Sequence, residues 1–126
     1  MKKVLATTQA PAAIGPYSQG ISAGNMTFLS GQLGIDPATG DFVTNEVKGQ
    51  TEQSLKNVQA ILKETGLTLK QVVKTTVFLA DMNDFAAMNE MYATFFEEPY
   101  PARSTIAVKT LPKNALVEIE VIAVAL

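Results

Sequence analysis

Apolar residues gather in short stretches of the first third of the chain, separated by turn residues, which predicts β-strands. The stretches are residues 3–7, 17–23 and 26–33. Gly24-Asn25, between the last two, is a two-residue turn of the kind that tolerates positive φ. The segments 10–16 and 36–40 are rich in Pro and Gly, so we expect loops there.

The hydrophobic spacing changes to three and four residues between about Asn45 and Thr65. This period predicts an amphipathic helix, and Gly66 stands where its C-cap would be. Residues 72–80 are rich in β-branched side chains, so we expect them to form a strand.

A second helix is expected after that strand, with possible N-caps in residues 81–84 and apolar positions as far as Phe96. Two further strands, over residues 104–109 and 115–126, are joined by a turn at 111–114. The order β-β-β-α-β-α-β-β over residues 1–126 predicts one α+β domain, a six-stranded mixed sheet with two helices on one face.

The last predicted strand is apolar on both sides, although the two helices can cover only one face of the sheet. One side carries Ala115, Val117, Ile119, Val121 and Ala123. The other carries Leu116, Glu118, Glu120, Ile122, Val124 and Leu126. Because an exposed apolar patch marks an interface, we expect a homo-oligomer that packs through this face or edge to edge.

The composition excludes several kinds of chemistry. The chain has no Cys and no His, which removes disulfides, thiol nucleophiles, thiolate zinc sites and Ser-His-Asp triads. The formal net charge is −2 and Arg103 is the single arginine, so nucleic-acid binding is not expected. There is no phosphate-binding glycine loop, and the carboxylates are too scattered to predict a metal site. No apolar run is long enough for a signal sequence or a membrane helix, which predicts a soluble cytoplasmic protein.

Glu118 and Glu120 are two residues apart in the last predicted strand and should project from the same face. Leu116 and Ile122 flank them, and a carboxylate among apolar groups either has a raised pKa or is paired. General acid–base work by one of them is one interpretation. The other is a pair of glutamates on a solvated strand edge.

Arg103 lies at the proline-stiffened start of a strand, and its guanidinium is suited to holding a small carboxylate through two hydrogen bonds. The alternative is a structural salt bridge to Glu118 or Glu120, on the expectation that the two C-terminal strands pair with each other through their short turn.

Three further positions are candidates for a ligand site. Ser30-Gly31 interrupts an apolar strand, and a glycine there indicates either a bulge or the close approach of a ligand. Tyr17 follows a Pro-Gly segment, and Asn89 lies between Met88 and Tyr92 on the second helix, where an exposed side chain is the simpler interpretation.

Several motifs together resemble the RidA family of reactive-intermediate (enamine/imine) deaminases. The motifs are Ala10–Gly20, Ser30-Gly-Gln32, Val73–Phe78, Asn83-Asp-Phe85, Pro101-Ala-Arg-Ser104 and Leu111–Ala123. They follow one colinear order over nearly the whole chain. The resemblance implies a chorismate-mutase-like fold and a homotrimer with clefts between subunits.

The resemblance also implies an activity: hydrolysis of 2-enamino and 2-imino acids, such as 2-aminocrotonate and 2-aminoacrylate, to 2-oxo acids and ammonia without a cofactor. The family's carboxylate-binding arginine falls on Arg103 and its water-activating glutamate on Glu118, which leaves Glu120 a structural role. The positions implied to line the cleft are Tyr17, Ser30, Gly31, Asn89 and Thr105.

This chain departs from the family pattern twice. Thr105 stands where relatives commonly have Cys, and Gln32-Leu-Gly34 stands where many read Gln-Ile-Pro. The hydrolysis needs no thiol, so we expect it to survive the first change. The second is expected to alter the stiffness of a loop near the cleft.

Three other functions are weighed against the deaminase. A trimer that binds 2-oxo acids without turnover would need only Arg103. A ribonuclease is poorly served by one arginine and no histidine. A glycosidase using Glu118 and Glu120 would need two adjacent side chains to flank a sugar bond from opposite sides.

Overall fold

The computed structural model describes residues 1–125, so the end of the expected last strand, Leu126, lies outside the described residues. The strands are β1 (Lys2–Leu5), β2 (Gly20–Ala23), β3 (Met26–Leu29), β4 (Gln32–Leu33), β5 (Val72–Leu79), β6 (Ala102–Ala107) and β7 (Val117–Val124). The α-helices are α1 (Val47–Lys63) and α2 (Phe85–Tyr92), and the 3-10 turns are η1 (Leu69–Gln71), η2 (Met82–Asp84) and η3 (Pro112–Asn114).

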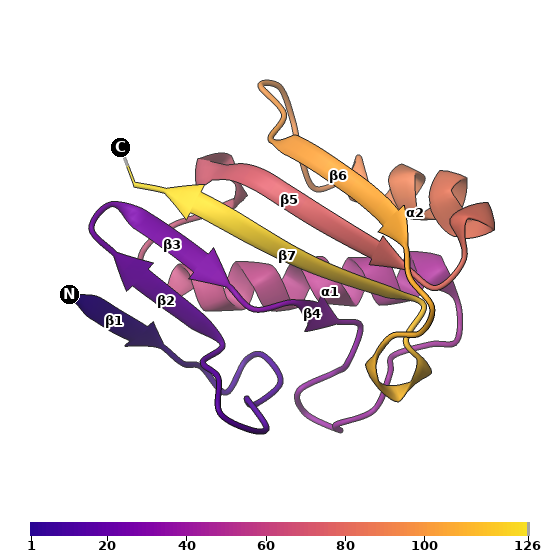
Figure 1. The fold of residues 1–126 in the computed structure, drawn as a ribbon, viewed down its shortest axis with the longest axis horizontal. Helices are drawn as coiled ribbons and strands as arrows, with labels where there is room; N and C mark the ends of the chain where they lie inside the picture. Colours follow the sequence, from indigo (N-terminus) through magenta and orange to yellow (C-terminus); the bar gives the residue numbers. More distant parts are fainter. Residues whose placement is uncertain (126) are drawn as a thin grey trace.

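The strands form one mixed sheet in the order β1-β2-β3-β7-β5-β6, with the short β4 beside β7. Neighbouring strands are antiparallel except for β5 and β6, which run parallel. Parallel neighbours need a crossover connection, and η2 and α2 provide it. Both α-helices lie on the same side of the sheet (Figure 1). The predicted α+β architecture is confirmed.

The core lies between α1, α2 and the covered face of the sheet. Strand β7 alternates along its length, because Val117 and Ile119 are fully buried beneath the helices while Glu120 is exposed. From α1, Leu55 and Ile61 are also fully buried. The helical spacing of three and four residues is the signal that identified α1 in the sequence.

The opposite face of the sheet has no helix over it, and we call it the open face. Phe28 pairs with Ile122, and Ile106 lies in the same row as Phe78 and Glu118, so these side chains share that face. Phe28 is 40% exposed and Ile106 is 48% exposed. The apolar uncovered face predicted from β7 is therefore present.

Two predicted elements differ from the structure: one strand is interrupted, and the second helix ends earlier than expected. The expected strand over 26–33 is divided into β3 and β4 at Ser30. The backbone N–H of Ser30 donates to the Gln19 carbonyl, and its hydroxyl donates to the Ser18 carbonyl. The second helix ends at Tyr92 rather than Phe96. Beyond Tyr92, backbone hydrogen bonds join residues that are three apart, as in a 3-10 turn; the N–H of Phe95, for example, donates to the Tyr92 carbonyl.

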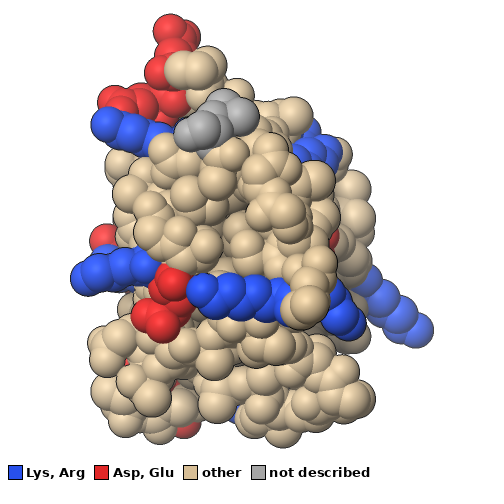
Figure 2. All heavy atoms as spheres, turned by 90° about the vertical axis from the view of Figure 1, so that its left-hand side faces the viewer, with Lys and Arg blue, Asp and Glu red and all other residues tan. Residues whose placement is uncertain are grey.

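The side of the molecule that carries β1 has charges of both signs. Lysine or arginine side chains form a loose band across the middle of this surface with acidic groups beside them, and large uncharged areas lie above and below (Figure 2). Among the helices of residues 1–125, none is long and apolar enough to cross a membrane.

Candidate functional site

Four of the sequence-predicted site residues line two cavities, Tyr17 and Gly31 the first and Asn89 and Arg103 the second. The first, which we call the Gly31 cavity, has a volume of about 510 Å³, and Tyr17, Gly31, Leu33 and Lys113 are among the residues that line it.

 The second, the Arg103 cavity, has a volume of about 460 Å³ and is lined by residues that include Asn89, Tyr92 and Arg103. Each cavity holds one of the two residues expected to do chemistry or lies directly against it.

Glu118 leaves the open face of β7 and lies against Gly31, which lines the first cavity, although Glu118 itself is not among the lining residues. The carboxylate lies against Gly31, since a Cβ built on this glycine would fall 2.7 Å from Cδ and 2.9 Å from Cγ of Glu118. The pairing of Leu33 with Glu118 fixes the neighbouring backbone. Gly31 is therefore needed because a carboxylate, rather than a ligand, approaches its backbone.

The environment of Glu118 favours its protonated form. Burial raises the pKa of the Glu118 carboxyl above its ordinary value, and the negative charge of Glu120 raises this pKa further. A carboxylate with a raised pKa is a stronger base once it is ionised, which suits it to accept a proton from water. Of the two interpretations offered by the sequence, the structure favours the raised pKa over a fully solvated pair.

Arg103 is held on the opposite side of the sheet by α2. Its Nη1 donates a hydrogen bond of 2.7 Å to Oδ1 of Asn89. The guanidinium lies over the ring of Tyr92, 4.7 Å from its centroid, and 5.5 Å from the centroid of Phe85. These contacts fix the plane of the guanidinium and leave other N–H groups free to bind a carboxylate.

Tyr92 serves as the platform beneath Arg103. Its hydroxyl shares a 2.8 Å hydrogen bond with the hydroxyl of Thr75 on β5, and both residues are buried. Burial raises the pKa of the Tyr92 phenol, with the Thr75 hydrogen bond and the nearby Arg103 charge acting against it. The ring therefore stays neutral and in place.

The predicted salt bridge between Arg103 and Glu118 or Glu120 is wrong. The two C-terminal strands do not pair, because β5 lies between β6 and β7. Thr75, on the helix side, pairs with Arg103, whereas Phe78, on the open face, pairs with Glu118. The two side chains thus leave opposite faces of one sheet. Among residues 1–125 the ion pair that forms is between Lys48 and Glu90, 2.9 Å apart.

The remaining predicted residues take different positions. Tyr17 is 53% exposed at the rim of the Gly31 cavity, and its hydroxyl accepts a hydrogen bond from the Ile14 backbone N–H. Ser30 donates its hydroxyl to the carbonyl of Ser18 at 2.6 Å, so it braces the loop. The hydroxyl of Thr105 is buried and finds no hydrogen-bond partner among the described residues.

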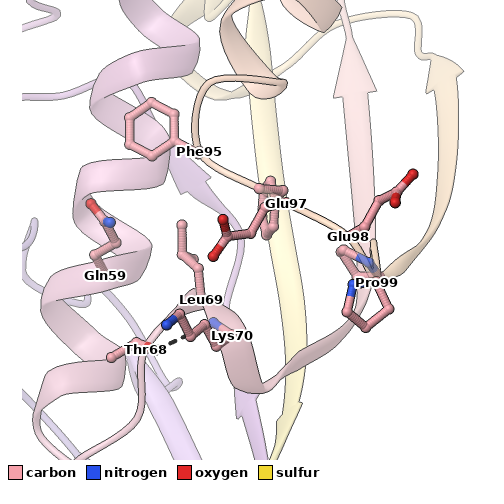
Figure 3. Close-up of a pocket in the computed structure, with 10 residues that line it drawn as sticks. Gln59, Thr68, Leu69, Lys70, Phe95, Glu97, Glu98 and Pro99 are labelled. Carbon is pink, nitrogen blue, oxygen red and sulfur yellow. Dashed lines mark hydrogen bonds between the residues drawn. The ribbon is translucent and has the colours of Figure 1, made fainter.

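A third cavity, of about 490 Å³, lies between α1, η1 and the segment after α2. Glu97 points across it toward Leu69 and Gln59, while Glu98 points away (Figure 3). None of the sequence-predicted residues lines it. In the part of the chain that the structure describes, no three acidic side chains gather closely enough to hold a metal ion.

The sequence analysis treated Phe85 and Tyr92 only as apolar helix positions and missed their contact with Arg103. A signal for Tyr92 was available, because Asn89 and Tyr92 are three residues apart and so share a helix face. The same signal was available for Phe85, which is four residues before Asn89 and so shares its helix face.

Residues 7–125 match the model of the endoribonuclease L-PSP family. The chain belongs to this family. Reactive Intermediate Deaminase A of Arabidopsis thaliana is 57% identical over 122 residues, which are 97% of this chain and 65% of that protein. The 2-iminobutanoate/2-iminopropanoate deaminase of Escherichia coli is 51% identical over 127 residues, with 98% of each chain covered.

The fold agrees with the family. The crystal structure of Escherichia coli TdcF with bound serine superposes with a TM-score of 0.93 at 46% sequence identity, covering 98% of this chain and 99% of that one. The resemblance to the RidA family and the chorismate-mutase-like fold expected from it are both confirmed.

Proposed function

We propose that the protein is a hydrolytic deaminase that converts 2-imino and 2-enamino acids to 2-oxo acids and ammonia without a cofactor. The names of relatives that are 57% and 51% identical in sequence support this reaction. The observation that carries the proposal is the pair of complementary groups: an arginine with further donors at one cavity, and a carboxylate of raised pKa against Gly31, which lines the other.

The chemistry needs little beyond these two groups. Arg103 binds the substrate carboxylate through two parallel hydrogen bonds, which fixes the C=N carbon in position. Glu118 takes a proton from a water molecule as the water oxygen bonds to that carbon. The carboxyl then returns this proton to the nitrogen. As the C–N bond breaks, the new hydroxyl gives its proton to the Glu118 carboxylate, the C=O bond forms, and the 2-oxo acid and ammonia leave. The iminium carbon is electrophilic by itself, so no covalent intermediate is required.

The site requires two copies of the chain. Arg103 and Glu118 leave opposite faces of the sheet, so one substrate cannot touch both in a single protomer. The exposed apolar side chains of the open face, such as Phe28 and Ile106, supply a surface for a second copy. We therefore place each active site at an interface, Glu118 from one copy and Arg103 from its neighbour, in a homotrimer.

A binding protein for 2-oxo acids is the second candidate. The Arg103 cavity supports it, because Asn89 and Tyr92 already orient the guanidinium for a carboxylate. A ribonuclease is not favoured by this chain, since Arg103 is its single arginine and histidine is absent.

An assay coupled to a threonine or serine dehydratase tests the proposal. It follows 2-oxo acid release while a trap consumes free imine, and compares the protein with Arg103→Ala and Glu118→Gln. We expect the wild-type chain to accelerate release and both folded variants to fail. A wild-type rate equal to the spontaneous rate, with retained 2-oxo acid binding, would instead establish the binding protein.

A further inference from the structure

Helix α1 buries a stripe of polar side chains. Gln50 is 2% exposed, and Thr51, Ser54 and Asn57 are fully buried. Their spacing of three and four residues puts them on neighbouring positions of the helix surface. Polar groups buried in this way are costly unless they are hydrogen-bonded, so their partners indicate what the stripe is for.

Two of these side chains bond to the backbone of the segment that contains β4. The Ser54 hydroxyl donates to the Gln32 carbonyl at 2.7 Å. The Asn57 amide donates to the carbonyls of Leu33 and Ile35 at 3.1 Å and 3.0 Å. Segment 32–35 is therefore held by α1 on one side while β4 pairs with β7 on the other.

Gln50 joins α1 to the loop before the helix and to the residue before β7. Its amide donates to the Thr44 carbonyl at 3.0 Å, and its side-chain oxygen accepts the backbone N–H of Leu116 at 2.9 Å. Gly34 packs directly on the helix, since a Cβ there would lie 2.6 Å from the Gln50 carbonyl oxygen. The segment thus has little freedom to move away from β7.

We propose that Ser54 and Asn57 are positioning residues for Glu118. Through the carbonyls of segment 32–35 they hold Gly31 against the Glu118 carboxylate and keep water from its inner side. Neither side chain touches the reacting atoms. The catalytic consequence rests on the proposed deaminase function, but the position and hydration of Glu118 do not.

The hydration of Glu118 gives this role a measurable signature. Burial is the main cause of the raised pKa of Glu118, and the Glu120 charge on the same strand adds to it. Of the basic groups, Lys74 on β5 pairs with Ile122 and so shares this face, and Lys113 lines the Gly31 cavity. If segment 32–35 loosens, water reaches the carboxylate and the pKa of Glu118 falls toward its ordinary value.

The test compares Ser54→Ala and Asn57→Ala with Thr51→Val. Thr51 belongs to the same buried stripe, but its hydroxyl has no hydrogen-bond partner among the described residues, so it is a matched control. Carbon-13 NMR of the Glu118 carboxyl, assigned with Glu118→Gln, gives its pKa in each protein without reference to activity. The pH profile of kcat/KM gives the same pKa through the reaction.

We expect Ser54→Ala to lower the pKa of Glu118 by about half a unit and Asn57→Ala to lower it further, while Thr51→Val leaves it unchanged. The acid limb of kcat/KM should move to lower pH by the same amount, and kcat should fall about tenfold with a smaller change in KM.

If the NMR titration finds the pKa of Glu118 unchanged in Ser54→Ala, the proposal is overturned, even if the variant is less stable than wild type. The same would follow if Ile61→Val, which weakens the core on the same helix, moved the pKa equally. If Asn57→Ala does not fold, Ser54→Ala decides the matter alone. A wild-type chain without deaminase activity would refute the proposed function, and the NMR titration would still decide the role of Ser54.

Discussion

Replacing Gly31 by alanine tests how closely the activity depends on the position of one carboxylate. The three atoms nearest to a Cβ at this position all belong to Glu118, with Cδ at 2.7 Å and Cγ at 2.9 Å. The φ of Gly31 lies outside the positive region, so alanine can adopt the backbone. The added methyl group therefore acts mainly by displacing the Glu118 side chain.

The size of the displacement follows from these distances. Ordinary van der Waals contact begins at 3.4 Å, so Cδ must move from 2.7 Å by about 0.7 Å or more. A misplacement of about 1 Å costs about 100-fold in rate, so we expect kcat/KM to fall by about 10- to 100-fold. The side chain can rotate away at a cost of about 1 kcal/mol, so the protein should remain folded.

Two measurements separate the effects on rate and on stability. The dehydratase-coupled assay gives kcat/KM, and urea unfolding gives the stability of Gly31→Ala in the wild-type and Glu118→Ala backgrounds. Because the methyl group collides with Glu118 alone among its nearest neighbours, its cost should largely disappear in the second background. Full activity in a folded Gly31→Ala protein would refute the reasoning.

Other variants probe the two halves of the site. Glu118→Gln should be at least as stable as wild type at pH 8. The pKa of Glu118 is higher in the folded than in the unfolded protein, so this carboxyl contributes its full stabilisation only below its unfolded pKa. That contribution is lost as the pH rises through the folded-state pKa. Urea unfolding at pH 4 and 8 checks this, and a variant with a lower free energy of unfolding than wild type only at pH 8 contradicts it. Arg103→Lys should raise KM about tenfold or more, because it loses the planar pair of donors; an unchanged KM argues against the carboxylate role. Tyr92→Phe leaves the Thr75 hydroxyl unpaired and should lower the free energy of unfolding by about 1 kcal/mol, with KM nearly unchanged.

The sequence predicted most elements because their signals are local. The apolar run of β7 and the helical spacing in α1 need no knowledge of partners, and both elements form where expected. The pairing of β6 with β7 was wrong because a short turn fixes the order of strands along the chain, not their order in the sheet. Here the parallel crossover through α2 puts β5 between them.

The same limit applies to the site. Motifs identified Arg103 and Glu118, yet the face from which each leaves the sheet depends on the pairing of β5 with both of its neighbours. Gly31 was singled out as a close approach, but only the fold shows that Glu118 is what approaches. The bonds from Ser54 and Asn57 to segment 32–35 could not be predicted, since both residues are read from sequence as ordinary helix positions.

The claim that each active site takes Arg103 from one copy and Glu118 from another is tested most directly by mixing two inactive variants. Arg103→Ala and Glu118→Gln are unfolded together in equal amounts, refolded, and assayed for 2-oxo acid release beside each variant refolded alone. Random assembly leaves about a quarter of the interfaces with both wild-type side chains, so the mixture should recover about a quarter of wild-type activity. A mixture that forms mixed oligomers yet stays as inactive as its components would contradict the shared site.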